Sequence, residues 1–501
     1  MSSKGRLSTR EKLGKLHTGL TFDDVLLVPR YSRVRSRHDV NISTKLTPKI
    51  TLNIPIISAN MDTVTESEMA VALAREGGIG IIHRFMGLEA QVAQVQRVKR
   101  MESIIIESPY ALGSNAKISD VRKMMREKNV GGILIIDDEG KLEGIVTTRD
   151  LRFVEYSNSS VTAVMTKRKD LVVGTWGKTT IDKAKKIMQD EKIEKLPLVD
   201  SRDKLKGLVT AKDILKRKEF PNATKDSKGR LRVGAAIGVR GDFLERAKKL
   251  VDSDVDVLVL DIAHGDSAHA LEAIKRIKKA LPEVELIAGN IATSEGAAHL
   301  IKSGADSIKV GVGSGSICIT RIVTGSGVPQ LTAISDCSLI AKDSGVTLIA
   351  DGGIRNSGDI TKSLVAGADS VMIGSLLAGT DESPGEIVFR GTQRYKVTRG
   401  MASMAARRDQ LQREGRSVSE SEVQNHEDGD LSDFVPEGVE AIVPYKGGAV
   451  FVIRQLAGGL RSGLSYCGAS NLKELKSNGR FIKITDVGLI ESKPHDVVTD
   501  L

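Results

Sequence analysis

Short apolar runs recur along the chain, and small or polar residues follow each of them. Eight have the length and composition of buried strands, at residues 54–58, 78–83, 233–238, 255–262, 285–291, 307–311, 347–351 and 370–374. From the third onward they alternate with segments of helical periodicity, at 243–251, 268–281, 294–303 and 360–367. Buried strands that alternate with amphipathic helices predict an α/β fold with a parallel sheet, and eight of them favour a closed (β/α)8 barrel. A doubly wound open sheet is the alternative.

The loops after the strands carry the residues that could bind a ligand or take part in catalysis. They are 58–62, Asp261, Asn290, 311–320, 351–353 and 374–375. Because the loops that follow the strands build the active site of such barrels, these residues predict a site at that end.

One of these loops, Gly311-Val-Gly-Ser-Gly-Ser-Ile-Cys-Ile-Thr320, combines glycines with a cysteine. The glycines allow backbone amides to approach an anion, and Cys318 supplies a soft nucleophile beside them. The loop therefore predicts covalent chemistry on a phosphorylated small molecule. The alternative is a tight turn around an inert, buried cysteine. Cys337 and Cys467 are far away in the sequence, which argues against a disulfide framework or a zinc site.

Residues 104–218 lie outside the barrel pattern and contain an internal repeat. Residues 118–125 and 144–150 resemble residues 181–188 and 207–213, at a common offset of 63 (181 − 118 and 207 − 144). Each unit is predicted to be a helix, two strands and a terminal helix that begins near an aspartate.

The repeat resembles a pair of CBS modules, which we place at 104–160 and 161–219. The resemblance implies that the pair binds an adenine or guanine nucleotide, with Asp150 and Asp213 at the ribose. The alternative is a structural insert in which each aspartate caps a helix.

Residues 399–435 change character, because residues 407–430 within them are highly charged and nearly free of apolar side chains. Such a segment cannot bury itself, which predicts a mobile flap at about 403–435. A flap beside the site could exclude water in one step and move in another. A surface excursion without a function is the alternative.

Composition narrows the class of protein. The chain has 501 residues and a formal charge of +10, which favours anionic partners. Aromatic residues make up only 3 %, and basic residues are mixed with acidic ones, so nucleotide-sized anions are favoured over nucleic acid. The chain contains no run of 18 apolar residues, so the sequence predicts no membrane span. The first residues lack an apolar signal core, so we expect a cytoplasmic protein.

Several motifs in order resemble the inosine-5′-monophosphate (IMP) dehydrogenase family over nearly the whole chain. They are LTFDDVLLVP at 20–29, NMDTVTE at 60–66, GGIGIIH at 77–83, TGSGVPQ at 324–330, ADGGI at 350–354, RGMA at 399–402, VPEGVE at 435–440, VPYKG at 443–447 and GLIESKPH at 488–495. The resemblance implies a catalytic barrel, built from residues 1–103 and 220–501, that is interrupted by the CBS pair.

The family oxidises IMP to xanthosine 5′-monophosphate (XMP) with NAD and a potassium ion, the committed step of guanine nucleotide synthesis within purine biosynthesis. The resemblance implies that the Cys318 thiolate adds to C2 of the purine, that hydride leaves for NAD, and that water hydrolyses the resulting thioimidate. It also implies that Thr320 and Glu437 together take the proton of that water.

The resemblance assigns the remaining contacts as follows. The substrate phosphate lies against Ser316, Gly353, Gly374 and Ser375. Asp351 holds the ribose hydroxyls, and further substrate contacts come from Gly352, Thr398, Arg399, Gly400, Met401, Ala402 and Glu437. Asp261, Gly311, Val312 and Gly313 contact NAD, although Asp261 could instead be a buried charge paired with His264. Potassium binds carbonyls of Gly313, Gly315 and Cys318, and Glu491, Ser492 and Lys493 of a neighbouring subunit complete that site, which implies a homotetramer.

The chain departs from the family in three places. The dehydrogenases usually carry an Arg-Tyr pair in the flap, and none occurs between Met401 and Val435, although Arg413 and Arg416 lie there. Thr398 replaces a tyrosine that often contacts the phosphate, and Ala402 replaces a glycine. A guanosine 5′-monophosphate (GMP) reductase, which converts GMP to IMP with NADPH, also lacks the pair, and Asn60 is reductase-like. That enzyme is the alternative activity, and a nucleotide-sensing scaffold without catalysis is a third.

Overall fold

The computed structural model describes residues 16–101, 105–107, 109–128, 130–154, 158–212, 214, 220–413 and 435–494. The chain forms two compact units. The first contains residues 1–98, 222–224 and 232–501, and the second contains residues 99–221 and 225–231. Among the described residues, no helix is both long and apolar enough to cross a membrane.

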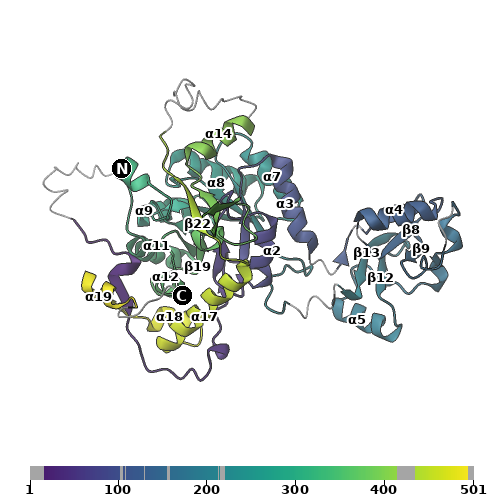
Figure 1. Cartoon of the computed structure of the whole chain (residues 1–501), viewed down its shortest axis with the longest axis horizontal. Helices are drawn as coiled ribbons and strands as arrows, with labels where there is room; N and C mark the ends of the chain where they lie inside the picture. Colours follow the sequence, from purple (N-terminus) through teal and green to yellow (C-terminus); the bar gives the residue numbers. More distant parts are fainter. Residues whose placement is uncertain are drawn as a thin grey trace. The chain divides into compact units, whose positions relative to one another are not determined.

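The first unit is built around a closed barrel of parallel strands (Figure 1). In the order in which they pair, the strands are β14 (Val233–Ile237), β15 (Val257–Asp261), β16 (Glu285–Ile291), β17 (Ser307–Val310), β18 (Thr347–Asp351), β19 (Ser370–Ile373), β4 (Ile56–Ser58) and β5 (Ile79–Ile82). Each of the eight predicted runs became one of these strands, so the (β/α)8 prediction is confirmed and the open sheet is excluded.

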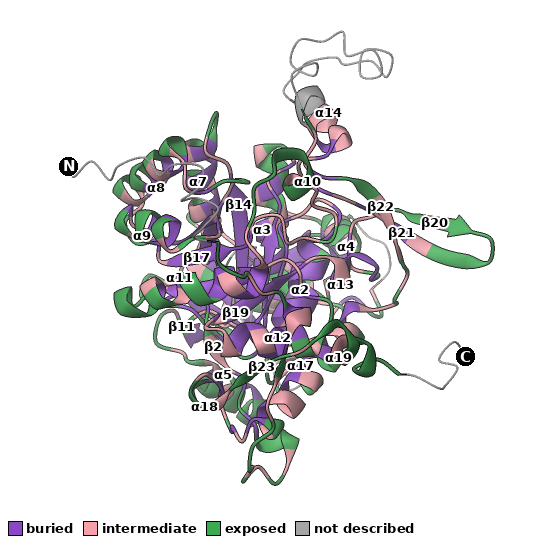
Figure 2. Cartoon of the chain, turned by 90° about the vertical axis from the view of Figure 1, so that its left-hand side faces the viewer, coloured by how far each residue is buried: buried purple, intermediate pink, exposed green. Residues whose placement is uncertain are grey.

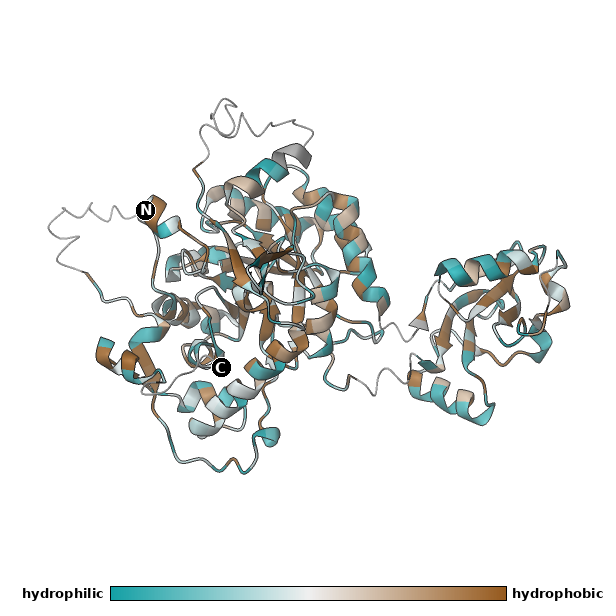
Figure 3. Cartoon of the chain, viewed as in Figure 1, coloured by the Kyte–Doolittle hydropathy of each residue, from teal (hydrophilic) through white to brown (hydrophobic). Residues whose placement is uncertain are grey.

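Helices surround the barrel, and their ribbons carry both hydrophilic and hydrophobic residues (Figure 3). They are α2 (Ser67–Arg75), α3 (Leu88–Met101), α7 (Phe243–Asp252), α8 (Ala268–Ala280), α9 (Ser294–Lys302), α11 (Gln330–Ser344), α12 (Ser357–Val365), α17 (Ala449–Tyr466) and α18 (Leu472–Asn478). In α7 the buried residues Phe243, Ala247 and Leu250 recur at helical spacing. The helix α9 starts where the Thr293 side chain accepts a hydrogen bond from the Gly296 amide.

The barrel interior is a packed core of aliphatic side chains (Figure 2). Ile57, Ile81, Val259 and Ile349 are each 0 % exposed, and they come from four different strands. Because this core leaves no passage along the barrel axis, a ligand site must lie at one end of the strands.

Smaller elements lie at the ends of the first unit. The short helices α10 (Thr320–Thr324) and α13 (Ser375–Ala378) follow β17 and β19, and a three-stranded antiparallel sheet contains β20 (Ile387–Arg390), β21 (Gln393–Arg399) and β22 (Glu440–Pro444). The remaining elements are η1 (Phe22–Asp24), β1 (Val25–Leu27), η2 (Arg37–Asp39), β2 (Thr44–Lys45), β3 (Thr51–Leu52), β23 (Phe481–Lys483) and α19 (Asp486–Glu491). The predicted flap begins as the helix α14 (Met404–Arg413). Residues 414–434, which include Arg416, lie outside the described residues.

The second unit repeats one structure twice. Its elements are β6 (Ile105–Ile106), β7 (Ala111–Gly113), α4 (Ile118–Lys128), β8 (Gly132–Ile136), β9 (Leu142–Thr147), η3 (Val161–Ala163), β10 (Thr166–Lys167), η4 (Arg168–Asp170), β11 (Gly174–Thr175), α5 (Ile181–Asp190), β12 (Lys195–Val199) and β13 (Leu205–Thr210). The starts of α4 and α5, of β8 and β12, and of β9 and β13 are each offset by 63 residues (181 − 118, 195 − 132 and 205 − 142). Each half exchanges a strand with the other, because β10 joins the sheet of β7–β9 and β6 joins the sheet of β11–β13.

The terminal helix predicted near Asp150 is wrong. Residues 148–153 form turns. The Asp150 carboxylate accepts hydrogen bonds of 2.8 Å from both the amide and the hydroxyl of Thr147, which closes a tight turn. The side chain of Leu151 then enters the core of the unit. The second aspartate of the repeat, Asp213, lies outside the described residues.

Candidate active site

The cysteine loop lies at the carboxyl ends of the barrel strands, between β17 and α10. Its first glycine, Gly311, has φ +152°, and a Cβ atom there would lie 1.9 Å from the carbonyl oxygen of Asp351. Only glycine fits this contact, because any side chain would collide with the end of β18. The loop is therefore pressed against the strand that carries Asp351.

Cys318 begins a chain of polar contacts that ends on a carboxylate. Its Sγ lies 3.1 Å from Oγ1 of Thr320, and that hydroxyl donates a 2.7 Å hydrogen bond to Oε2 of Glu437. Because the Thr320 hydrogen is used toward Glu437, the thiol is the donor in the first contact. Cys318 is partly exposed, whereas Cys337 and Cys467 are buried. This chain brings together the three predicted catalytic residues and places the Thr320 hydroxyl between the sulfur and the carboxylate.

Backbone hydrogen bonds hold Glu437 in place from two sides. The Ile319 amide donates to the Glu437 carbonyl at 2.8 Å, and the Glu437 amide donates to the Ala402 carbonyl at 3.0 Å. Cys318 and Gly438 also form an antiparallel bridge. The segment around Glu437 thus lies between the cysteine loop and the Arg399–Ala402 turn.

A cavity of about 180 Å³ opens beside the cysteine loop. Ala59 and Met61 contribute an apolar part of its wall, and Arg355 lies at it as well. Seven of the residues predicted to contact substrate also line it, namely Ser316, Asp351, Gly352, Gly353, Gly374, Ser375 and Thr398. Gly352 has φ +95°, and a Cβ atom there would lie 2.6 Å from the Ser314 hydroxyl oxygen. Glycine amides and serine hydroxyls are the donors that bind phosphate, so this wall fits a phosphate group.

A buried lysine that the sequence analysis missed holds Asp351. Lys309 is 3 % exposed, and its Nζ lies 2.7 Å from Oδ2 of Asp351. Nζ also donates to the Asn290 side chain, which in turn donates to Asp351 at 3.0 Å. Burial alone would lower the pKa of Lys309, but the carboxylates of Asp351 and Asp261 outweigh it and raise the pKa. The ammonium therefore stays charged and fixes the Asp351 carboxylate at the cavity.

Asp261 lies outside this cavity, in a larger one of about 770 Å³ at the ends of β5, β14 and β15. Its carboxylate lies 3.6 Å from Nε of Arg84 and 4.0 Å from Nζ of Lys309. These are its ion pairs, so the alternative pairing with His264 is not the arrangement found. Lys309 contacts the acidic residue of each cavity, which links the two sites. Of the other predicted cofactor contacts, the Val312 carbonyl accepts a 3.4 Å hydrogen bond from Arg321.

Arg399 is part of a second ionic cluster that the sequence analysis did not find. Its guanidinium donates to Asp62 at 2.5 Å and to Asp409 of α14 at 2.6 Å. Burial alone would lower the pKa of Arg399, but the two carboxylates outweigh it and raise the pKa. The Asp62 amide lies 3.2 Å from the sulfur of Met401, so the Arg399–Ala402 turn is tied both to the loop after β4 and to α14. Asp62 lies in a loop that the sequence analysis singled out, whereas Asp409 gave no signal in the sequence.

The predicted potassium ligands come from two places in the fold. Gly313 and Gly315 belong to the cysteine loop, where the Cys318 amide donates to the Gly315 carbonyl at 3.2 Å in a tight turn. The Gly315 carbonyl thus already accepts a hydrogen bond within the loop, and backbone carbonyl oxygens are the kind of ligand that suits potassium. Glu491, Ser492 and Lys493 lie at the end of α19, which contacts η1. Their assignment to the loop of a neighbouring subunit stays a prediction.

The chain is similar to known proteins over nearly its whole length. The family described as "IMP dehydrogenase / GMP reductase domain" matches residues 19–495. The inosine-5′-monophosphate dehydrogenase of Nitrosopumilus maritimus is 54 % identical over 480 residues, with 96 % of this chain and 98 % of that protein covered. The enzyme of the same name from Bacillus subtilis is 52 % identical, with 96 % of each chain covered.

Two solved structures of GMP reductase from Trypanosoma brucei are also similar. The structure in complex with guanosine 5′-monophosphate has a TM-score of 0.88 and 43 % identity, and it covers 97 % of this chain and 100 % of that one. The structure in complex with guanosine 5′-triphosphate has a TM-score of 0.77 and 40 % identity, with 95 % and 99 % covered. This chain belongs to the IMP dehydrogenase / GMP reductase family.

Proposed function

We propose that the protein oxidises IMP to XMP with NAD through a covalent bond at Cys318. The observation that carries this proposal is the Cys318–Thr320–Glu437 chain beside a cavity lined with phosphate-binding groups. The relatives that are 54 % and 52 % identical are both inosine-5′-monophosphate dehydrogenases, which supports the same direction of reaction.

In the first half of the reaction, Cys318 loses its thiol proton to solvent and the sulfur adds to C2 of the purine, so Glu437 is still ionised when the second half begins. The substrate is oriented by the phosphate wall at one end and by Asp351 at its ribose, because a carboxylate with two acceptor oxygens suits a vicinal diol. NAD, when bound, accepts the hydride from C2. The purine then remains attached to Cys318 as a thioimidate.

In the second half, water attacks C2 and displaces the sulfur to release XMP. Oγ1 of Thr320 lies 3.1 Å from Sγ, so a water that attacks an atom bonded to sulfur comes within reach of that hydroxyl. Thr320 takes the proton of this water as it passes its own proton to Glu437. This relay supplies a base in a chain that has no Arg-Tyr pair in its flap.

For the cofactors, the large cavity with Asp261 and Arg84 holds NAD, and carbonyls of Gly313, Gly315 and Cys318 hold potassium. Glu491, Ser492 and Lys493 of a neighbouring subunit complete the potassium site, so the active form is a homotetramer. Turnover that rises with potassium, but not with lithium, would support this assignment.

The second unit is proposed to be a CBS pair that binds an adenine or guanine nucleotide. Its support is the repeated topology with an exchanged strand in each half. A solved relative was studied in complex with guanosine 5′-triphosphate, which also favours a purine nucleotide. Calorimetry with ATP and GTP tests this, and Asp150→Ala should weaken binding.

A GMP reductase is the second candidate, favoured by the missing Arg-Tyr pair and by the solved relatives of that name. The two reactions share the cysteine and run hydride in opposite directions. The test is absorbance at 340 nm in potassium buffer with two substrate pairs, IMP with NAD and GMP with NADPH. We expect a rise with the first pair and no change with the second. A fall with the second pair, without a rise with the first, would establish the reductase.

A further inference from the structure

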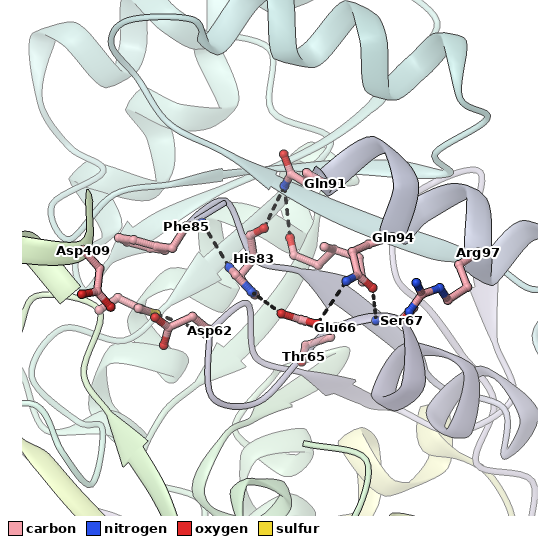
Figure 4. Close-up of polar contacts among 12 residues, drawn as sticks. Asp62, Thr65, Glu66, Ser67, His83, Phe85, Gln91, Gln94, Arg97 and Asp409 are labelled. Atoms are coloured by element: carbon pink, nitrogen blue, oxygen red, sulfur yellow. Dashed lines mark hydrogen bonds and ion pairs between the residues drawn. The ribbon is translucent and has the colours of Figure 1, made fainter. Parts of the chain in front are cut away.

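A buried histidine, His83, follows β5 and has both ring nitrogens engaged (Figure 4). The residue is 2 % exposed. Its Nδ1 accepts a 3.1 Å hydrogen bond from the Phe85 amide, and its Nε2 lies 3.4 Å from Oε1 of Glu66. A carboxylate can only accept, so Nε2 carries the proton and Nδ1 does not. The ring therefore donates one hydrogen bond, through Nε2 to Glu66, and accepts one, through Nδ1 from Phe85.

The Nε2 contact holds the loop that lines the smaller cavity. Glu66 ends the loop between β4 and α2, in which Ala59 and Met61 contribute to the cavity wall. Its second carboxylate oxygen accepts a 3.0 Å hydrogen bond from Gln94, whose own oxygen accepts from the Ser67 amide at 2.9 Å. Glu66 is thus the point at which the α2 end of this loop is tied to α3, whereas Asp62 and Thr63 tie its middle to Arg399 and Thr398.

The groups around the His83 ring favour the ionised form of the Glu66 carboxylate. The hydrogen bond from His83 is the main cause that lowers the pKa of Glu66, with smaller help from Gln94 and Arg97. Arg97 also donates to the Ser67 hydroxyl at 3.4 Å. The acceptor for the His83 proton is therefore charged in neutral solution, which strengthens the contact.

The Nδ1 contact holds the loop that lines the larger cavity. Phe85 belongs to residues 84–87, all of which line that cavity, and Arg84 forms the ion pair with Asp261. The strand end itself is fixed separately, because Gln91 donates to the carbonyls of His83 at 3.0 Å and of Ala236 at 2.8 Å. Gln91 thus holds the backbone of His83. The His83 ring contacts the loop that ends at Glu66 and the loop of residues 84–87.

We propose that His83 is a positioning residue that fixes one loop of each substrate cavity through a different ring nitrogen. The Nε2–H contact with Glu66 sets the loop of the nucleotide cavity, and the Nδ1 contact with Phe85 sets the loop of the dinucleotide cavity. The naming of the two cavities rests on the proposed function, whereas the division of the two loops between the nitrogens rests on geometry alone.

Two substitutions separate the nitrogens. In His83→Asn the amide oxygen can occupy the place of Nδ1, which keeps the Phe85 contact and loses the Glu66 contact. In His83→Gln the amide nitrogen can reach the place of Nε2, which keeps the Glu66 contact and loses the Phe85 contact. Glu66→Ala removes the first contact from the other side, so it stands in for His83→Asn if that variant does not fold. His38→Asn, at an exposed position of η2, is the control.

Amide hydrogen exchange on the full chain reads out each loop without any substrate. We expect His83→Gln to speed exchange in residues 84–87 about tenfold and to leave residues 59–66 unchanged. His83→Asn and Glu66→Ala should instead speed exchange in residues 59–66 and leave residues 84–87 unchanged. Equal effects of His83→Gln and His83→Asn on both loops, or no effect on either, would overturn the proposal.

Kinetics then connect the loops to the cavities. With IMP and NAD, His83→Gln should raise the KM for NAD about tenfold and His83→Asn the KM for IMP, with kcat within about twofold in both. A fall in kcat with both KM values unchanged would overturn the assignment of loops to cavities. A wild-type protein that turns over GMP and NADPH instead would refute the proposed function, and the exchange experiment would still decide the role of His83.

Discussion

The hydroxyl of Thr320 donates a 2.7 Å hydrogen bond to Oε2 of Glu437, a residue 117 positions further along the chain. The contact depends on three segments that meet only in the folded barrel. The Glu437 backbone is held by the amide of Ile319 on one side and by the carbonyl of Ala402 on the other. A carboxylate so fixed can accept a proton through the Thr320 hydroxyl, which lies beside Cys318.

The three cysteines should differ sharply in reactivity. Burial, with smaller effects of Asp336 and Glu295, raises the pKa of Cys337 to about 12, and burial also raises the pKa of Cys467. Because the thiolate is the reactive form, iodoacetamide at pH 8 should label Cys318 at least about 100-fold faster than Cys337.

Mass spectrometry of the labelled peptides measures this selectivity. Cys318→Ala should remove the rapid label and abolish turnover, while the oligomer size stays unchanged. Rapid modification of Cys337 or Cys467 in that variant would contradict the reactivity order, and substantial residual NADH production would exclude covalent catalysis at Cys318.

Lys309 should be needed for both stability and substrate binding. Lys309→Met would leave the mostly buried Asp351 carboxylate without its cation, and removing one partner of such a pair costs about 3–5 kcal/mol of unfolding free energy. The KM for IMP should also rise about tenfold or more, because Asp351 loses its fixed orientation. Denaturant titration and steady-state kinetics measure the two effects.

The matched control is Lys302→Met, at an exposed position at the end of α9, for which we expect a change within about 0.5 kcal/mol. A Lys309→Met protein as stable as this control would show that the ion pair with Asp351 contributes little.

The second unit should lose stability in acid through Asp226. Its carboxylate is 10 % exposed and lies 3.1 Å from Lys99 and 2.9 Å from Arg230. Burial alone would raise the pKa of Asp226, but the two cations and a backbone hydrogen bond lower it overall. Because the folded pKa lies below the unfolded one, the stabilisation is present above about pH 4 and is lost as the pH falls through the folded value.

The measurement is the melting temperature of wild type and of Asp226→Asn between pH 7 and pH 3. The wild type should melt higher at pH 7, and the difference should shrink below about pH 4. Asp138→Asn, an exposed carboxylate of the same unit, should match the wild type throughout. A difference in melting temperature between wild type and Asp226→Asn that grows as the pH falls would mean that the folded pKa of Asp226 is raised. That result would refute the account of this ion pair.

The barrel was predictable because its strands are buried on both faces and therefore stand out as short apolar runs between amphipathic helices. The residues expected at the substrate phosphate were assigned through the family resemblance, and the structure places them together in the wall of one cavity. Lys309 was missed because a lysine inside a strand gives no local sign that its ammonium reaches two acidic residues, one on the adjacent strand β18 and one on β15, two strands away.

Local sequence patterns could not predict contacts between segments that are far apart in the chain. Thr320 and Glu437 were paired only through the family resemblance, since nothing in their spacing indicates contact. The helix predicted after Gly144–Asp150 failed for a different reason. The Asp150 side chain that could have capped a helix instead accepts from Thr147 and closes a turn.

The most direct test of covalent catalysis at Cys318 with hydrolysis through Thr320 and Glu437 is rapid mixing of Glu437→Gln with IMP and NAD. NADH is followed at 340 nm, and intact protein mass is measured at the end of the burst. We predict a fast NADH burst, slow steady-state turnover, and a Cys318 adduct with the mass of IMP less two hydrogens. Glu440→Gln, an exposed neighbour, should behave like wild type. NADH formation without an adduct at Cys318, or without a burst in Glu437→Gln, would contradict the account.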